Sequence, residues 1–398
     1  MTKIIFGPYH PAYKEPIGLV LEVEGEKVVD AKISIGYAHR SVERILENSK
    51  WISGMIVASR VCGICSSVHC STYCFAVEKM FGVEIPERAK FLRMIFLELE
   101  RLHSHLLWLA FLFHEIGFDT PFMHILEDRE KLLQLIEEIA GRRVIWMVSI
   151  PGGVRRDLKG NHIKKIKKLL DFLEKRLKVY ENLIKEKTVI VRLREVGILN
   201  KKIAKEFGCV GPVARASGLR CDIRYENPYY FYSYSPFNIQ LGTKGDCYER
   251  LVVRLKEMKN SIEIIKWCIE EMTPGPISEK IHPLSAPAEG EAISRHEAPR
   301  GELFYYLKSS GGETPEKVRI RTPTFANIFS LATLLKDCYL ADVPAIVFSF
   351  DPCVACMDRT LILDRSKNKT FIWDKHQFIL FSRRWYKKNY KLVEKERL

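Results

Sequence analysis

Hydrophobic and polar residues alternate near the start of the chain in the pattern of β-strands. Two alternating segments, Ile17–Val23 and Lys27–Ile33, stand on either side of a short turn at 24–26 that contains a glycine. Alternation around such a turn is the signal of a β-hairpin. We therefore expect short strands within the first 36 residues.

Helical periodicity dominates the next part of the chain. Residues 87–116 contain almost no helix-breaking residue and are apolar on more than one face, which predicts a helix inside a bundle. Residues 161–187 place apolar side chains at steps of three and four with lysines between them, and residues 247–272 repeat the pattern. Both segments are predicted to be amphipathic helices.

The second half of the chain mixes strands and helices. Residues 208–234 are rich in Gly, Pro, Arg and aromatics and show no clean period. Residues 298–350 predict a strand, a loop, a helix and a final strand at Ala345–Phe350. The predicted fold class is α+β, mainly α, with a central helical bundle and small mixed or antiparallel sheets at its ends.

We divide the chain into four regions. Residues 1–36 form an N-terminal β-hairpin region, and residues 37–200 form a helical bundle with a first cysteine motif. Residues 201–359 form an α+β region with a second cysteine motif, and residues 360–398 are a basic C-terminal extension.

The composition is that of a folded protein. With 47% hydrophobic and 28% charged residues, the 398-residue chain is not disordered as a whole. No apolar run approaches the roughly 20 residues of a membrane-spanning helix. The N-terminus lacks the apolar segment of a secretory signal, so we expect the chain in the cytosol or on the inner face of a membrane.

Half of the net charge of +14 lies in the C-terminal extension. Residues 360–398 contain eleven Lys and Arg against four Asp and Glu, so this segment alone contributes +7. The rest of the chain is only moderately basic, and no nucleic-acid-binding motif accompanies the charge. We therefore expect no nucleic-acid partner.

Two C-x-x-C pairs are the strongest chemical signal. Cys62 and Cys65 form one pair, Cys353 and Cys356 form the other, and 287 residues lie between them. A single pair would fit a redox pair or core packing equally well. Two pairs with charged neighbours favour a metal site of four thiolates that joins both ends of the fold. The separation is too long for a local zinc knuckle, but spacing alone does not name the metal.

The residues that flank the pairs predict their local structure. If a helix begins near Cys65, His69 lies one turn later on the same side. We expect Asp351 and Pro352 to follow a strand and to cap a new helix, which would place Cys353 and Cys356 at its N-terminus. The helix dipole would then favour thiolates.

The sequence around both pairs resembles a known family. Residues Arg60–His69 and Asp351–Arg359 resemble the two signature motifs of the large subunit of [NiFe] hydrogenases, and the resemblance extends over residues 4–359. Arg359, where many hydrogenases carry histidine, points to the membrane-bound, energy-converting branch. Residues 211–224 are similar to the quinone-site subunit of respiratory complex I, the 49 kDa type, whose members lack the four metal cysteines.

The resemblance implies a metal pair and its ligands. Cys62 and Cys353 match the terminal nickel ligands, and Cys65 and Cys356 match the ligands that bridge nickel and iron. In this family the iron also carries carbon monoxide and cyanide ligands.

The resemblance also implies further site residues. Arg300 matches a guanidinium over the open metal site, Thr324 a hydroxyl that binds a cyanide, and Asp351 a carboxylate that orients this shell. Glu15 matches an acid that passes protons, and on sequence alone it would be read as an exposed turn residue. Glu43 matches a carboxylate near a third ion, magnesium or iron, and could equally be a helix-surface glutamate.

We therefore predict the catalytic large subunit of an energy-converting [NiFe] hydrogenase, which interconverts H2 with protons and electrons. The remaining seven cysteines form no cluster-binding array, so a small subunit with a [4Fe-4S] cluster is expected as a partner. Ferredoxin is the expected electron carrier, and membrane subunits would hold the complex at the cytoplasmic face of the cell membrane. The alternatives are a complex I-like quinone-site NADH dehydrogenase subunit without metal and a structural zinc protein.

The C-terminal extension has two interpretations. Many hydrogenase large subunits lose such a segment by proteolysis, and we favour removal after Arg359. The alternative is a permanent arm with strands near 361–363 and 371–373.

Overall fold

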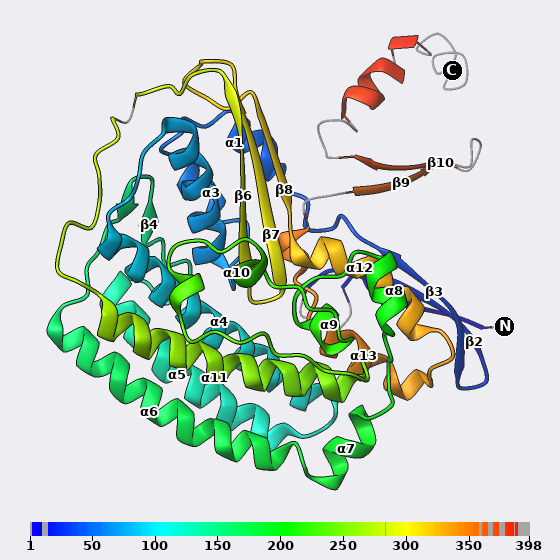
Figure 1. Cartoon of the computed structure of the whole chain (residues 1–398). Coiled ribbons are helices and arrows are strands. Elements are labelled where there is room, and N and C mark those ends of the chain that lie inside the picture. Colours follow the sequence, from blue (N-terminus) through cyan, green and yellow to red (C-terminus); the bar gives the residue numbers. More distant parts are fainter. Residues whose placement is uncertain are drawn as a thin grey trace.

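Four long helices form the body of the computed structural model (Figure 1). They are α4 (Glu87–Glu115), α5 (Asp119–Ala140), α6 (Gly160–Leu183) and α11 (Cys247–Glu271). Helices α4 and α6 each pack against both α5 and α11. Residues 91–106 of α4 are buried without interruption, which confirms the helix inside a bundle that its pattern, apolar on more than one face, predicted. The three long helices predicted from periodicity are confirmed, although α6 ends at Leu183.

The structure describes residues 2–9, 15–282, 284–357, 360–364, 369–373, 379–385 and 387–388. No helix in these ranges combines the length and the apolar character that a membrane crossing requires. The shorter α-helices are α1 (Val42–Glu47), α2 (Gly54–Ala58), α3 (Ser66–Phe81), α7 (Lys187–Leu193), α8 (Lys201–Glu206), α9 (Gly211–Ala216), α10 (Ile223–Glu226), α12 (Pro323–Leu335) and α13 (Val343–Phe350). Single 3-10 turns lie at Tyr232–Tyr234, Leu340–Asp342 and Val354–Cys356.

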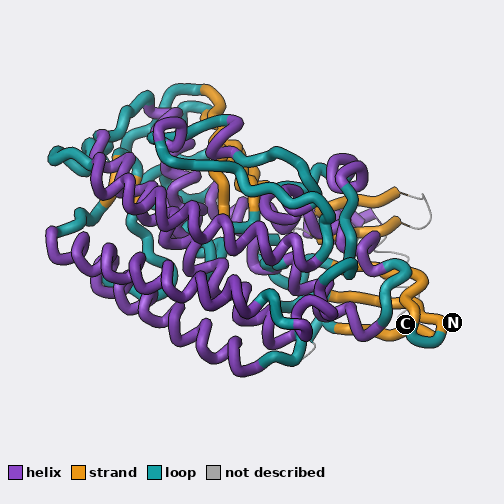
Figure 2. The backbone as a smooth tube through the Cα atoms, turned by 60° about the horizontal axis from the view of Figure 1, so that its bottom comes forward, coloured by secondary structure: helices purple, strands orange, loops and turns teal. Residues whose placement is uncertain are grey.

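Small antiparallel sheets flank the helices (Figure 2). The N-terminal sheet has the order β1 (Thr2–Phe6), β2 (Gly18–Glu24), β3 (Lys27–Ser34), and β2–β3 is the predicted hairpin. A second sheet has the order β6 (Gly290–Ala298), β7 (Gly301–Ser309), β8 (Lys317–Arg321), and α3 packs on β6 and β7. A short pair joins β4 (Ser149–Ile150) to β5 (Gly153–Val154). The predicted class, α+β and mainly α, is confirmed.

One predicted strand is wrong. Residues Ala345–Phe350 belong to helix α13, which begins at Val343 with a proline in its first turn and packs against α4 and α11. A short continuous apolar run fits a buried strand and a buried helix equally well, so periodicity could not separate them. Asp351 therefore ends a helix, with a left-handed φ of 61°, and does not cap a new one.

The C-terminal extension contains the two strands of the second interpretation. Strands β9 (Thr360–Asp364) and β10 (Lys369–Trp373) pair in antiparallel fashion. The proposed cleavage point after Arg359 lies outside the described residues.

Candidate metal centre

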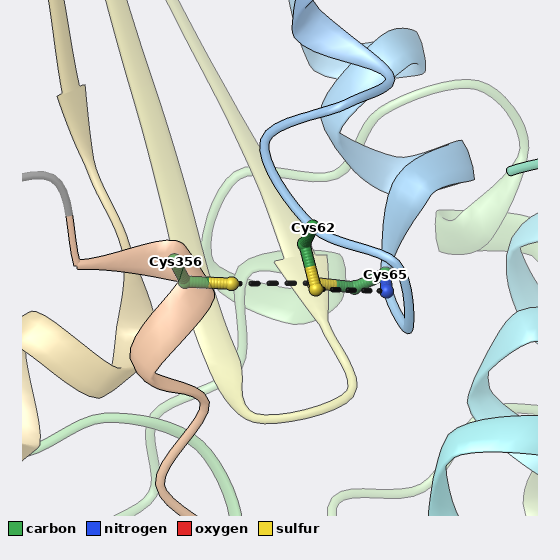
Figure 3. Close-up of side chains that lie close together, drawn as sticks. All are labelled: Cys62, Cys65 and Cys356. Carbon is green, nitrogen blue, oxygen red and sulfur yellow. Dashed lines mark hydrogen bonds between the residues drawn. The ribbon is translucent and has the colours of Figure 1, made fainter. Parts of the chain in front are cut away.

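The thiols of both cysteine pairs meet in the interior of the molecule. The Sγ atoms of Cys62 and Cys353 are 3.5 Å apart, those of Cys65 and Cys356 are 3.6 Å apart, and those of Cys353 and Cys356 are 3.3 Å apart. Figure 3 shows three of these thiols turned toward one another. All four side chains are buried, and none forms a disulfide. Two segments separated by 287 residues in the sequence thus meet at one place.

The first pair lies where the chain enters helix α3. Cys65 is the N-cap of α3, which confirms the helix predicted near this residue. The backbone N–H groups of Ile64 and Cys65 each donate to Cys62 Sγ over 3.3 Å. His69 lies one turn into the helix, with Nε2 at 3.8 Å from Cys356 Sγ and Nδ1 at 2.8 Å from the Tyr305 hydroxyl.

The second pair lies on a single 3-10 turn. Cys353 precedes the turn and Cys356 ends it. The prediction that these thiols lie at an α-helix N-terminus is wrong, because α13 has already ended at Phe350. Thr324, in the first turn of α12, accepts the backbone N–H of Cys353 over 3.1 Å.

The thiols need a cation if all four are to ionise. Hydrogen bonds from Cys356 and Cys62 lower the pKa of Cys65 to about 7. Cys356 also lowers the pKa of Cys353, but Cys62 and burial outweigh it and raise that pKa to about 12. Like charges at these distances repel in a buried site. The donor set therefore fits soft metal ions, which stabilise all the thiolates together.

A buried ion pair lies beside the thiols. The Nη2 of Arg300 donates to Asp351 Oδ1 over 2.6 Å, and its Nε donates to the Asp351 backbone oxygen over 3.0 Å. Burial opposes the charge, but Asp351 and the Cys353 thiol hold the pKa of Arg300 well above its ordinary value. The left-handed backbone of Asp351 aims both acceptors at one guanidinium, which is the kind of local strain that functional sites retain.

Two contacts in this region were not predicted. Ser104, on α4, accepts a hydrogen bond from Arg300 Nη1 over 3.2 Å. The guanidinium of Arg254 stacks 4.2 Å from the Trp108 ring and lies 4.0 Å from Asp351 Oδ2. One feature of the sequence could have indicated the role of Arg254. It is a charged residue on the apolar face of the predicted helix 247–272, four residues after Arg250.

Of the two predicted glutamates, Glu15 is half-buried and Glu43 is buried. Glu15 Oε1 lies 4.0 Å from Cys353 Sγ, and Oε2 accepts the N–H groups of Val354 and Ala355. Burial raises the pKa of Glu15 to about 8. Glu43 is 5% exposed and accepts from the Ile320 N–H over 2.8 Å and from Arg319 Nη1 over 3.1 Å. Its role beside a third ion stays a prediction.

An apolar cavity of about 270 Å³ opens beside the thiols. Its wall includes Ile17, Leu107, Trp108, Phe111 and Val347, while Glu15, Arg300 and Asp351 supply the polar side. A small apolar molecule fits such a space, and the Glu15 carboxyl and the Arg300 guanidinium lie at its edge.

Two family models match the chain. The model described as the 49 kDa subunit of the respiratory-chain NADH dehydrogenase matches residues 115–359. The model described as nickel-dependent hydrogenase matches residues 40–139. The NADH dehydrogenase model covers Arg300, Asp351 and the pair Cys353 and Cys356. The hydrogenase model covers the pair Cys62 and Cys65.

Curated relatives include subunits of hydrogenases and of quinone oxidoreductases. The carbon monoxide-induced hydrogenase of Rhodospirillum rubrum is 37% identical and aligns over 89% of this chain and 98% of its own. The membrane-bound hydrogenase subunit alpha of Pyrococcus furiosus is 36% identical over 92% of this chain and 89% of its own. An NADH-quinone oxidoreductase subunit of Thermodesulfovibrio yellowstonii is 38% identical over 89% of this chain and 96% of its own.

A solved structure supports the same relationship. A chain of the membrane-bound sulfane sulfur reductase, an archaeal respiratory membrane complex, superposes with a TM-score of 0.86 at 33% identity. The alignment covers 90% of this chain and 98% of that one.

Proposed function

Because the chain belongs to the oxidoreductase family that unites nickel-dependent hydrogenases with the 49 kDa subunit of the respiratory-chain NADH dehydrogenase, we propose that it is the catalytic large subunit of an energy-converting [NiFe] hydrogenase. Its reaction is the interconversion of H2 with two protons and two electrons. The convergence of four buried thiols is the observation that carries this proposal.

The thiol geometry suits shared metal ions. Two sulfurs on one metal can be no further apart than about twice a metal–sulfur bond of roughly 2.3 Å. The sulfurs of Cys62 and Cys353, of Cys65 and Cys356, and of Cys353 and Cys356 lie 3.3 to 3.6 Å apart, within this limit. Cys62, Cys65 and Cys356 are the three whose sulfurs all lie within 4.8 Å of one another. Cys62 and Cys353 would bind nickel alone, and Cys65 and Cys356 would bind both nickel and iron. When bound, the metal pair would supply the site of heterolytic H2 cleavage.

The surrounding residues would handle charge and protons. Arg300, which donates two hydrogen bonds to Asp351, would provide a fixed cation beside the open side of the centre. Glu15 lies close enough to Cys353 to exchange a proton with its sulfur after small movements. Thr324 orients the Cys353 backbone and would bind a cyanide ligand of the iron. Glu43 would stand near a third ion, magnesium or iron.

The proposed partners follow from the need to carry electrons away from the metal centre. The seven cysteines outside the four-thiol site would bind no cluster, so electrons would leave through the [4Fe-4S] cluster of a small subunit to ferredoxin. Two of the similar proteins are named as membrane-bound, which supports membrane subunits as further partners. The chain would lie peripherally at the cytoplasmic face of the cell membrane.

A complex I-like quinone-site subunit without metal is the rival function. Subunits of quinone oxidoreductases match the chain at identities similar to those of the hydrogenases. Under this rival function the four thiols of this chain would be free. Members of the complex I group lack these four cysteines, so their presence here favours the hydrogenase. A structural zinc site is a second rival, which would hold the thiols without any redox role.

Metal analysis and infrared spectroscopy of the purified complex test the proposal. We expect about one nickel for each chain and sharp infrared bands from carbon monoxide and cyanide ligands. Zinc in place of nickel, without these bands, would establish the structural site. A metal-free complex that reduces quinone would establish the quinone-site function.

A further inference from the structure

Helix α3 has no side-chain hydrogen bond from its own N-cap residue. The first backbone N–H groups of a helix have no partner within it, and an N-cap side chain normally accepts one of them. The N-cap of α3 is Cys65, whose side chain makes no capping bond. Its thiol points instead to Cys356 Sγ at 3.6 Å, so this residue cannot serve both as a metal ligand and as a helix cap.

A glutamate from the neighbouring helix takes over the missing role. The Oε1 of Glu100, on α4, accepts the N–H of Ser67 over 2.6 Å, and its Oε2 accepts the N–H of Val68 over 2.8 Å. These are the second and third residues of α3, which are the amides that a cap satisfies. Glu100 stands more than thirty residues away in the sequence, so the cap comes from tertiary structure.

Burying the carboxyl group of Glu100 lowers the stability of the fold unless its oxygens are hydrogen-bonded. Its side chain is fully buried, and burial raises the pKa of this carboxyl to about 8 while the two backbone N–H groups act in the opposite direction. A buried acid without hydrogen bonds destabilises a fold. The two hydrogen bonds from the backbone N–H groups of Ser67 and Val68 offset part of that cost.

We propose that Glu100 is a positioning residue for the metal centre, which holds the first turn of α3 in register so that Cys65 can turn its thiol inward. The same turn carries His69, whose Nε2 lies 3.8 Å from Cys356 Sγ, so a shift of α3 would move two groups of the site together. This inference rests on the proposed metal-binding function. Glu100 would act on the centre through the backbone of α3, whose amides it binds.

Hydrogen exchange and nickel binding by the full, metal-free chain test the proposal. In Glu100→Ala, amide exchange in a peptide covering residues 65–69 should accelerate about tenfold or more, as for the loss of a helix cap. The affinity for Ni²⁺, followed by thiolate-to-nickel absorbance, should fall by about tenfold or more, because residues that orient metal ligands commonly have effects of this size. Glu100→Gln keeps one carbonyl acceptor and should give an intermediate loss in both measurements.

The matched control is Glu78→Gln on α3 itself. Glu78 is also buried, but it lies near the other end of α3, where it pairs with Arg93 and accepts from the Gly152 N–H. This variant should lower thermal stability without changing exchange at 65–69 or the Ni²⁺ affinity. Equal losses from Glu78→Gln would overturn the positioning role.

The two measurements separate the two proposals. Native-like Ni²⁺ affinity and exchange in both Glu100 variants would overturn the role of Glu100. If the native chain fails to bind Ni²⁺, the metal-binding function fails, and the exchange of residues 65–69 still decides the capping role. If Glu100→Ala does not fold, Glu100→Gln provides the decisive comparison.

Discussion

At the scale of single residues, the role of a buried cysteine follows from the group that its thiol contacts and not from its burial. Cys65 and Cys70 are both buried and stand within one helix or at its start. Cys65 faces the thiol of Cys356, whereas Cys70 donates to the Ser149 backbone oxygen over 3.2 Å. A hydroxyl can replace the second interaction, but it would not replace a thiolate that binds soft metal ions, the role proposed for Cys65.

This difference yields a prediction for paired serine variants. Cys356→Ser should abolish H2 turnover and lower the nickel content, because the serine hydroxyl stays protonated where a thiolate is required. Cys70→Ser should retain nickel and activity, since its hydroxyl still donates to the Ser149 oxygen. Metal analysis and H2-dependent dye reduction of both variants provide the measurement. Full activity of Cys356→Ser would contradict the ligand assignment.

Glu15 is predicted to carry protons without holding the metals. Glu15→Gln preserves the side-chain shape beside Cys353 but cannot accept a proton. Turnover should fall by about 10² to 10⁴, the usual range for a lost acid–base group. Nickel content and the infrared bands should remain. Normal turnover in this variant would place the proton exit elsewhere.

His296 should make stability depend on pH in a defined direction. It is fully buried among Phe75 and Tyr229, its Nε2 has no hydrogen-bond partner in the described part of the chain, and burial holds its pKa well below the ordinary value. Below pH about 6.5 the unfolded chain binds a proton there that the folded chain does not, so acid weakens the fold.

The comparison with His296→Phe isolates this effect. Phenylalanine fits the aromatic surroundings and does not titrate, so other ionisable groups cancel in the difference. The unfolding free energy of the native chain should fall relative to the variant by about 1.4 kcal/mol for each pH unit below about 6.5. Urea unfolding at pH 7, 6 and 5 measures it. A difference that does not change with pH would show that folded His296 takes up the proton.

At the scale of elements, buried ion pairs connect α4 with the segments that follow α9. Glu98 on α4 accepts from Arg224 over 3.2 Å, from Arg101 over 3.1 Å and from the Tyr232 hydroxyl over 2.6 Å. Burial opposes its ionisation, but the two arginines lower the pKa of Glu98 to about 2. This interaction is therefore intact above pH about 4.5 and is lost as the pH falls toward 2.

Removing the charge of Glu98 should lower the free energy of unfolding. Glu98→Gln leaves buried guanidinium groups without a full counter-charge, and we expect the unfolding free energy to fall by about 3 to 5 kcal/mol. The control is Glu138→Gln, which breaks a pair with Lys165 whose side chains are 40% and 44% exposed. Exposed pairs contribute about 1 kcal/mol or less. Similar losses in both variants, measured by denaturant unfolding, would contradict the importance of the buried network.

At the scale of the whole molecule, the C-terminal extension has two alternative fates. The described strands β9 and β10 fit a permanent arm, while the family resemblance favours removal after Arg359. We predict removal, which would lower the net charge from +14 to +7. Intact-mass measurement of the active, nickel-containing subunit gives the answer. A chain that still ends at Leu398 would make the extension part of the working protein.

The sequence by itself determined the long helices, the first hairpin and the two cysteine pairs of the candidate site. The period of apolar residues identified the long helices, and alternation identified the β2–β3 hairpin, because local patterns reflect which faces are buried. The two cysteine pairs and their flanking motifs pointed to one metal centre, because ligand chemistry depends on residue type. The position of Glu15 beside this centre came only from the family resemblance.

Tertiary structure alone decided which distant side chains support the centre. Helix α13 could not be distinguished from a strand, because a short apolar run fits either element when both are buried. Glu100 and Arg254 looked like ordinary charged residues of long helices, yet one caps α3 and the other faces Asp351. Their partners lie more than thirty residues away in the sequence, and only packing determines which buried charges meet.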